Sequence, residues 1–127
     1  MKVFASLKRP FQLWQHVVSH GMLLLRSPKG DGFATRVDLV FTNVHATCMR
    51  TSFPDLEVKL CEAAEAAEIR ARFGLQEAPD LNVFVLKAVG IPDGYVVASA
   101  MDWHEDAKEF SDRSHFDVPL MVHTYDD

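Results

Sequence analysis

The chain has 127 residues, of which 48% are hydrophobic and 24% charged, a composition typical of globular domains that argues against general disorder. Its formal net charge of −5 is unevenly spread: residues 1–50 carry seven Lys/Arg against two Asp/Glu, and residues 101–127 carry two against eight. We therefore expect a single domain, 1–127, whose basic front and acidic back favour contact with a protein partner or with a second copy of the chain.

Apolar runs in the chain are short. Met22–Leu25 is far below the length of a membrane span, and the first ten residues lack the apolar run of a signal peptide. Two cysteines, Cys48 and Cys61, are too few for a disulfide scaffold and are expected to be reduced, small buried residues. These features predict a cytoplasmic protein that makes no contact with a membrane.

Alternation of apolar and polar residues predicts strands in the first half of the chain. Strands are expected over 11–20 and 33–42, with extended chain over 22–26 and a Pro/Gly turn over 27–32. On the second strand, Arg36 and Asp38 fall on the face opposite the apolar residues, so they are expected to face solvent. Residues 44–50 either extend this strand or form another one, and residues 52–55 are expected to be a loop.

The second half begins with a short strand over 56–60 and a helix over 61–73. The helix is predicted by an apolar stripe with helical spacing, by the i,i+4 pair Glu68–Arg72, and by Gly74 as its stop. Residues 81–89 are almost all apolar and predict a central strand covered on both faces. A turn over 90–94 and a hairpin partner over 95–103 follow. Residues 104–114 are expected to be a loop or short helix, and 116–125 an edge strand or docked tail.

These elements predict an α+β fold, in which an antiparallel meander of about six to seven strands curves strongly around one helix at about 61–73. A barrel-like closure of the sheet is the alternative. Residues 104–127 would form an acidic loop and a docked tail.

The densest group of polar side chains lies near the end of the predicted hairpin. It comprises Trp103, His104, Glu105, Asp106 and His115. Imidazoles and carboxylates can ligate a divalent cation or share acid–base work. His104 and Asp106 would share a face only if the strand continued through them. The spacing matches no metal-site pattern, so a solvated acidic loop is the favoured interpretation.

A second group, Trp14, His16 and His20, alternates along the first predicted strand. Residues four apart on a strand are separated by about 13 Å, too far to share a metal ion. The favoured interpretation places them on the wetter face of a sheet. If that face is concave, they would instead line a groove for a small apolar ligand.

Five basic residues in the first part of the chain (Lys8, Arg9, Arg26, Lys29 and Arg36) are dispersed on a net acidic protein. They are better explained as a scattered, solvated set than as a nucleic-acid-binding stripe. Nucleic acid is therefore not an expected partner.

No nucleophile elbow, phosphate-binding loop, dinucleotide fingerprint or Cys-x-x-Cys motif occurs in the sequence, so no catalytic residue, metal site or cofactor is predicted. The leading hypothesis is a non-enzymatic module that binds a protein partner or itself. Two alternatives remain open: a small metal-dependent hydrolase centred on the 103–117 cluster, and an apolar-ligand binder that uses the concave face of the sheet.

Overall fold

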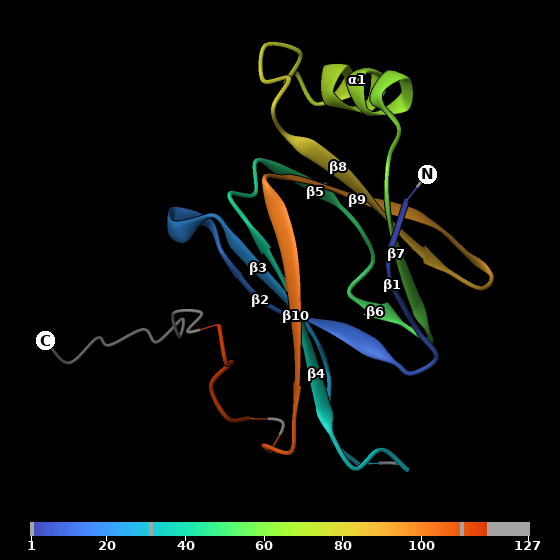
Figure 1. Cartoon of the computed structure of the whole chain (residues 1–127), viewed down its shortest axis with the longest axis vertical. Coiled ribbons are helices and arrows are strands. Elements are labelled where there is room, and N and C mark those ends of the chain that lie inside the picture. Colours follow the sequence, from blue (N-terminus) through green and yellow to red (C-terminus); the bar gives the residue numbers. More distant parts are fainter. Residues whose placement is uncertain (1, 31, 110, 117–127) are drawn as a thin grey trace, which may run out of the picture.

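The structure, a computed structural model, describes residues 2–30, 32–109 and 111–116. In this part of the chain ten strands form two antiparallel five-stranded sheets (Figure 1). Sheet A has the strand order β1 (Lys2–Leu7), β7 (Leu56–Leu60), β8 (Asn82–Ala88), β9 (Ile91–Ala98) and β5 (Ala46–Cys48). Sheet B has the order β10 (Ala100–Asp106), β4 (Arg36–Thr42), β3 (Met22–Ser27), β2 (Phe11–Val17) and β6 (Ser52–Phe53). A short 3₁₀ turn, Val18–His20, follows β2.

The two sheets share one apolar core, which alternate residues of their strands fill from both sides. Leu39 and Phe41 of β4 meet Phe84 and Leu86 of β8 in this core, and all four side chains are buried. The Phe41 and Phe84 rings meet edge to face, with their centroids 5.4 Å apart. We call the face of sheet B that points to this core its inner face, and the opposite one its outer face.

The helix α1 (Ala63–Arg72) lies within the predicted range and packs on the face of sheet A that is turned away from sheet B (Figure 1). Its small apolar stripe brings Ala66 and Ile69 against Val83 and Val85 of β8. Since the other face of β8 lies in the core between the sheets, the prediction of a central strand covered on both faces is confirmed. Gly74, at a φ of +71°, ends the helix as predicted.

The prediction of one curved sheet wrapping the helix is wrong, because the chain passes from one sheet to the other where a continuous strand was expected. Residues 95–103 contain the end of β9, a break at Ser99 and the start of β10, which belongs to the other sheet. Residues 43–45 make the same passage between β4 and β5, next to Ser99: the side chain of Asn43 donates to the Ser99 hydroxyl at 2.7 Å. Two sheets facing each other result.

Two elements were missed by the pattern. Residues 2–7 form β1, which pairs with β7, and residues 52–53 of the predicted loop form β6, which pairs with β2. Residues 104–106, expected to be in a loop, continue β10. The predicted tail 117–125 lies outside the described residues. No helix in the described part of the chain has the length and apolar character that crossing a bilayer requires.

Candidate interaction surface

Four of the predicted site residues, Trp103 to Asp106, lie on β10, the outermost strand of sheet B. The β10 register pairs Trp103 with Leu39 and His104 with Asp38. Because paired residues share a face, Trp103 and Glu105 lie on the inner-face side, and His104 and Asp106 on the outer face. The condition for His104 and Asp106 to share a face, that the strand continue through them, is thus fulfilled.

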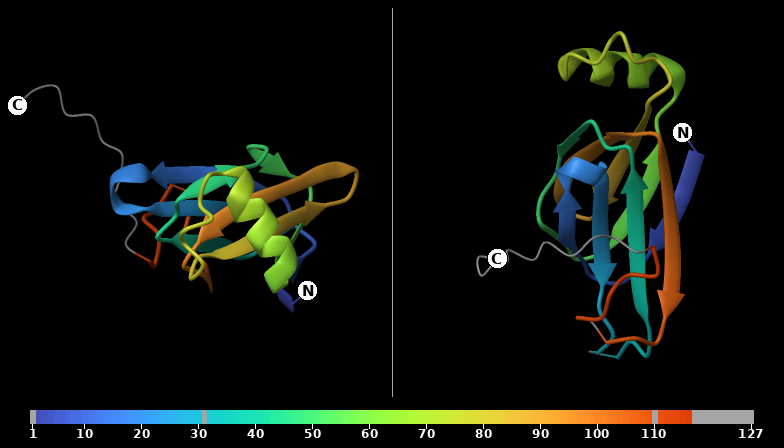
Figure 2. Two further views of the ribbon diagram at one scale, coloured as in Figure 1. Left: turned by 90° about the horizontal axis from the view of Figure 1, so that it is seen from above. Right: turned by 90° about the vertical axis from the view of Figure 1, so that its left-hand side faces the viewer.

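One edge of β10 has no neighbouring strand among the described residues. On its other edge all seven residues pair with β4, from Ala100 opposite Thr42 to Asp106 opposite Arg36, without a register shift. The topology explains this free edge. β10 follows β9 directly in the chain, and β8 pairs with β9 only as far as Ala98, so β8 does not reach β10. Figure 2 shows β10 as the border of sheet B.

The other three sheet edges in the described part of the chain are less suited to receive a strand. β5 has three residues and β6 has two. Beside β6 lies a hollow of about 410 Å³ lined partly by Pro10, Pro28 and Pro54, which have no N–H to donate. β1 carries a register shift between Val3 and Ala5. Short strands, prolines and bulges are three of the devices by which proteins prevent strand addition, and β10 has none of these three; of the further device, charged side chains, it carries Asp102, Glu105 and Asp106.

The backbone of β10 also shows which groups its free edge presents. The Trp103 N–H donates at 2.9 Å to the side chain of the preceding residue, Asp102, from which we infer that it points away from β4. Successive N–H groups of a strand point to opposite sides, so those of Met101 and Glu105 share the direction of Trp103. Trp103 itself is 46% exposed, one of four exposed large hydrophobic residues in the described part of the chain.

The outer face beside β10 contains a buried ion pair where the sequence predicted solvated residues. Arg26 of β3 donates from Nε and Nη2 to the two carboxylate oxygens of Asp38 on β4, and both side chains are at most 1% exposed. Arg36, also fully buried, donates to Asp106 of β10 at 3.1 Å. Two guanidinium groups thus face two carboxylates, so the charges within the group balance.

The segment after β10, residues 107–109 and 111–116, turns back and covers this group; we call it the return segment. Arg36 donates to the backbone carbonyls of Glu109, Asp112 and Arg113, at 2.7–3.1 Å. Arg26 donates to the Asp112 carbonyl as well. The Nε of Arg36 has no hydrogen-bond partner in the described part of the chain. These contacts fix the end of β10 relative to the rest of sheet B.

The Asp106 carboxylate responds to this environment. Its partial burial alone would raise its pKa, but hydrogen bonds from Arg36 and from the Lys108 backbone N–H, with the nearby positive charge, outweigh the burial. The pKa of Asp106 therefore lies below its ordinary value of 3.8. An ionised Asp106 is part of what holds β10 in place.

Aromatic side chains continue the outer face. The His115 ring of the return segment stacks on His104 of β10, with centroids 3.8 Å apart and 13° between the planes. Phe116 meets both rings edge to face and packs beside Trp14 on an apolar strip formed by Val17, Leu24 and Val40. The Arg26 guanidinium lies 5.1 Å from the centre of the Trp14 ring. Trp14, His104, Asp106 and His115 are therefore neighbours around one network.

His16 and His20 do not join this group. A bulge in the pairing of β2 with β3, between Leu13 and Gln15, interrupts the alternation on which the predicted Trp14–His16 face relied. His16 pairs with Leu23, a residue of the core between the sheets, so it belongs to the inner face, whereas Trp14 packs on the outer one. His20 is exposed in the 3₁₀ turn after β2, beside Ser19.

Glu105 takes part in a different contact. It accepts a hydrogen bond from the Thr35 hydroxyl, on the inner-face side of β10. Arg9 donates to Thr35 as well and to the Ser27 hydroxyl, and its guanidinium lies 4.3 Å from the centre of the Phe33 ring. Arg9 is buried, like Arg26 and Arg36, so the prediction of a scattered solvated basic set is wrong for these three arginines. Burial lowers the pKa of Arg9, and the negative charge of Glu105 opposes that shift.

Within residues 2–30, 32–109 and 111–116, no three His, Cys, Asp or Glu side chains are placed to hold a metal ion. His104 and His115 stack on each other, and Nε2 of His104 lies 3.5 Å from Oδ2 of Asp106, the carboxylate that Arg36 also contacts. Both cysteines are free, but Cys48 is exposed, contrary to the prediction that both are buried.

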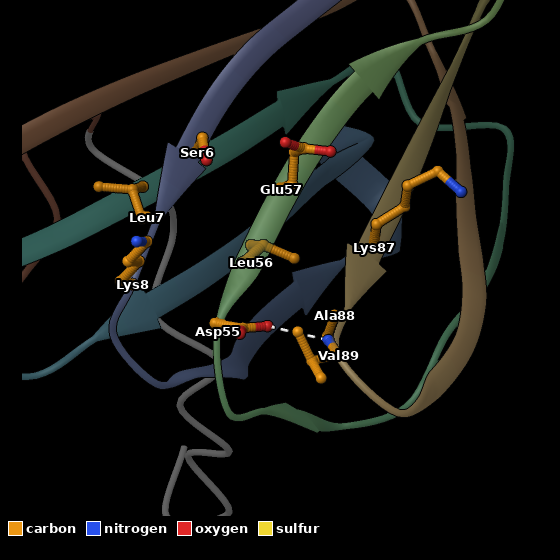
Figure 3. Close-up of a pocket in the computed structure, with 9 residues that line it drawn as sticks. All are labelled: Ser6, Leu7, Lys8, Asp55, Leu56, Glu57, Lys87, Ala88 and Val89. Atoms are coloured by element: carbon orange, nitrogen blue, oxygen red, sulfur yellow. Dashed lines mark hydrogen bonds between the residues drawn. The ribbon is translucent and has the colours of Figure 1, made fainter.

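A separate hollow of about 320 Å³ lies over the ends of β1, β7 and β8 (Figure 3). It contains none of the predicted site residues. Asp55 accepts a hydrogen bond from the Val89 backbone N–H there, and the charged ends of Glu57 and Lys87 lie apart from each other and from Asp55. Lys87 is paired with Asp93, outside the hollow, at 2.8 Å. This hollow therefore offers no convergent set of polar groups.

Among the described features, the free edge of β10 is thus the one that combines predicted site residues with a strand edge that no described strand pairs with. Compared with protein-family models, with curated proteins and with solved structures, the chain shows no match.

Proposed function

We propose that this protein is a binding module that takes up an extended strand of a protein partner along the free edge of β10. One observation carries the proposal: β10 is a seven-residue edge strand with a regular register and outward backbone groups, while the other described edges are short, bulged or bordered by prolines. In strand addition, main-chain hydrogen bonds supply affinity, and alternate side chains of the edge supply selectivity.

The anchoring of β10 supports this role. An edge strand that is ordered before binding loses little conformational entropy when a partner pairs with it. The Arg36–Asp106 contact and the return segment hold one end of β10, and the Ser99 region holds the other, where the Asn82 side chain donates to the Ser99 carbonyl. The receiving strand is therefore already in the geometry that pairing requires.

The side chains of β10 define what such a partner presents. On the outer-face side it meets Asp102, His104 and Asp106. On the inner-face side it meets Met101, Trp103 and Glu105, and the Glu105 carboxylate accepts a hydrogen bond from Thr35. A strand with polar or basic residues on one face and apolar residues on the other is complementary to this pattern. The two alternative functions from the sequence, metal-dependent hydrolysis and apolar-ligand binding, are supported by no comparable feature.

The test uses a capped synthetic peptide of about eight residues, alternating lysine and valine, as the probe. In the wild-type protein, binding is expected to slow hydrogen exchange at the backbone N–H groups of Met101, Trp103 and Glu105, measured by NMR. Glu105→Pro removes one outward N–H and leaves the edge facing β4 intact, whereas Glu105→Ala removes the same carboxylate but keeps the N–H.

We expect the affinity for the peptide to be at least about tenfold lower in Glu105→Pro than in Glu105→Ala. The reason is that the proline loses one main-chain hydrogen bond to the peptide and that its ring clashes with the incoming strand. The melting temperatures of the two variants show whether both are folded. Equal affinity of the two folded variants for the peptide would contradict strand addition at β10.

A further inference from the structure

We infer that the strand received by β10 is β10 of a second copy, paired antiparallel about a two-fold axis that passes through Trp103. This inference rests on the proposed function, because it names the partner of the same edge. It follows from the register that the free edge allows, and from the side chains that each register would bring together.

The outward backbone groups restrict how two β10 strands can pair. Hydrogen bonds form between the copies only if residues with outward N–H groups, Met101, Trp103 and Glu105, lie opposite one another. A two-fold axis also requires that the pairing be the same from either copy. The candidate axes therefore pass through one residue of the strand, and each choice gives one register.

Most of these axes place like charges directly opposite each other, which destabilises a sheet. An axis through Asp102 pairs Asp102 with itself, and one through Glu105 pairs Glu105 with itself. An axis through His104 pairs Asp102 with Asp106. An axis through Met101 leaves the second half of β10 without a partner.

An axis through Trp103 has neither fault. Trp103 is the midpoint of Ala100–Asp106, so all seven residues pair. Asp102 then lies opposite His104 of the second copy, Glu105 opposite Met101, and Asp106 opposite Ala100. No carboxylate lies directly opposite a carboxylate. Asp102 gives up the hydrogen bond from the Trp103 N–H, which then pairs with the second copy, and lies opposite His104, an imidazole whose Nε2 is 3.5 Å from Asp106 of its own copy.

Positively charged side chains within each copy offset part of the negative charge that β10 would bring to this interface. Asp106 is already hydrogen-bonded to Arg36, and Glu105 lies near Arg9. Trp103, 46% exposed in one copy, would meet its symmetry mate on the inner-face side and lose apolar surface to it. The two copies would then share a sheet of ten strands, closed by its symmetry and without a further free β10 edge.

A cysteine cross-link tests this register. In directly opposed, hydrogen-bonded residues the Cα atoms are about 5.5 Å apart, a separation that a disulfide spans. Trp103→Cys is therefore expected to give a covalent dimer on mild oxidation. Glu105→Cys is the matched control: its symmetry mate is four residues away along the partner strand, about 13 Å. Both are made with Cys48→Ser, because Cys48 is exposed, while Cys61 stays buried.

Sedimentation equilibrium of the full chain without added cysteines measures the association itself. A dimer is expected that persists when salt is raised from about 0.05 to 0.5 M, since two chains of net charge −5 repel each other and salt screens that repulsion. Glu105→Pro is expected to shift the protein to monomer, and Glu105→Ala to leave it dimeric.

A covalent dimer in Trp103→Cys but not in Glu105→Cys, together with a dimer of the unmodified chain, supports the inference. A monomer at every concentration, or cross-linking at Glu105→Cys instead, overturns it. If the chain is monomeric while the lysine–valine peptide still binds and is blocked by Glu105→Pro, the self-pairing fails and the proposed function stands. If neither peptide nor second copy binds, both fail.

Discussion

Arg26 donates from Nε and Nη2 to the two oxygens of Asp38, at 2.7 and 3.0 Å, and neither side chain is more than 1% exposed. This pair connects β3 to β4 on the outer face of sheet B, beneath the return segment. It couples the centre of the sheet to the segment that fixes β10.

The first expectation concerns this pair. Asp38→Leu leaves Arg26 buried without its carboxylate, and we expect a loss of about 3–5 kcal/mol in the free energy of unfolding, measured by urea denaturation. The double variant Arg26→Met/Asp38→Leu removes both charges and is expected to recover most of that loss. The Asp112 carbonyl, which loses the hydrogen bond from Arg26 in the double variant, still accepts one from Arg36. A double variant as unstable as Asp38→Leu would show that the buried charge is not the cause.

The second expectation is a pH dependence. Because the pKa of Asp106 is lowered in the folded protein, its contribution to stability is present above the ordinary value of 3.8 and is lost as the pH falls through the folded-state pKa. Asp106→Asn is expected to unfold more easily than wild type at pH 7, by about 1–2 kcal/mol. The difference should shrink below pH 3.8 when urea unfolding is repeated there. A difference that stays constant with pH would contradict the assignment.

The third expectation tests the core between the sheets. Phe84→Ala removes the ring that meets Phe41 and leaves a cavity, so we expect a loss of about 3–5 kcal/mol in unfolding free energy. Phe73→Ala is the comparison, since Phe73 at the end of α1 is 37% exposed and should cost much less. Similar losses for the two variants would argue against a shared core at Phe84.

The fourth expectation distinguishes the two thiols. Burial, together with the charge of Glu65, raises the pKa of Cys61 to about 11, so only about one thiol in a thousand is ionised at pH 8. Cys48 is exposed. A thiol reagent such as DTNB is expected to modify one cysteine rapidly in the native protein and two in denaturant. Rapid modification of Cys61 in the Cys48→Ser variant would contradict its burial.

Local patterns predicted much of the secondary structure. Three predicted features are found: the apolar helix stripe with Ala66 and Ile69, the helix end at Gly74, and the apolar strand β8. Each depends on residues that are close together in the sequence. The passage between the sheets was not predictable in the same way. Ser99 interrupts an otherwise continuous pattern, and its N–H is taken by the Thr42 carbonyl of a distant strand.

The buried arginines were mispredicted for a related reason. Arg36 and Asp38 alternate with core residues along β4, and this pattern is the one expected of residues that face solvent. What covers Arg36 is the return segment, whose acceptors lie 73–77 positions later in the chain and are backbone carbonyls, which no side-chain pattern reveals. Likewise the bulge at Leu13–Gln15 separates Trp14 from His16 although their spacing is two.

The long separation between Arg26 and the Asp112 carbonyl, 86 positions, bears on how the chain is made. While the polypeptide is emerging from the ribosome, β3 and β4 are available early, but β10 and the carbonyls that accept hydrogen bonds from both guanidinium groups follow only at residues 100–113. Until then β4 has an open edge and the arginines must stay hydrated. Sheet B can therefore reach its native packing only after synthesis has passed residue 113, and a nascent chain stalled before residue 100 would expose β4 to aggregation.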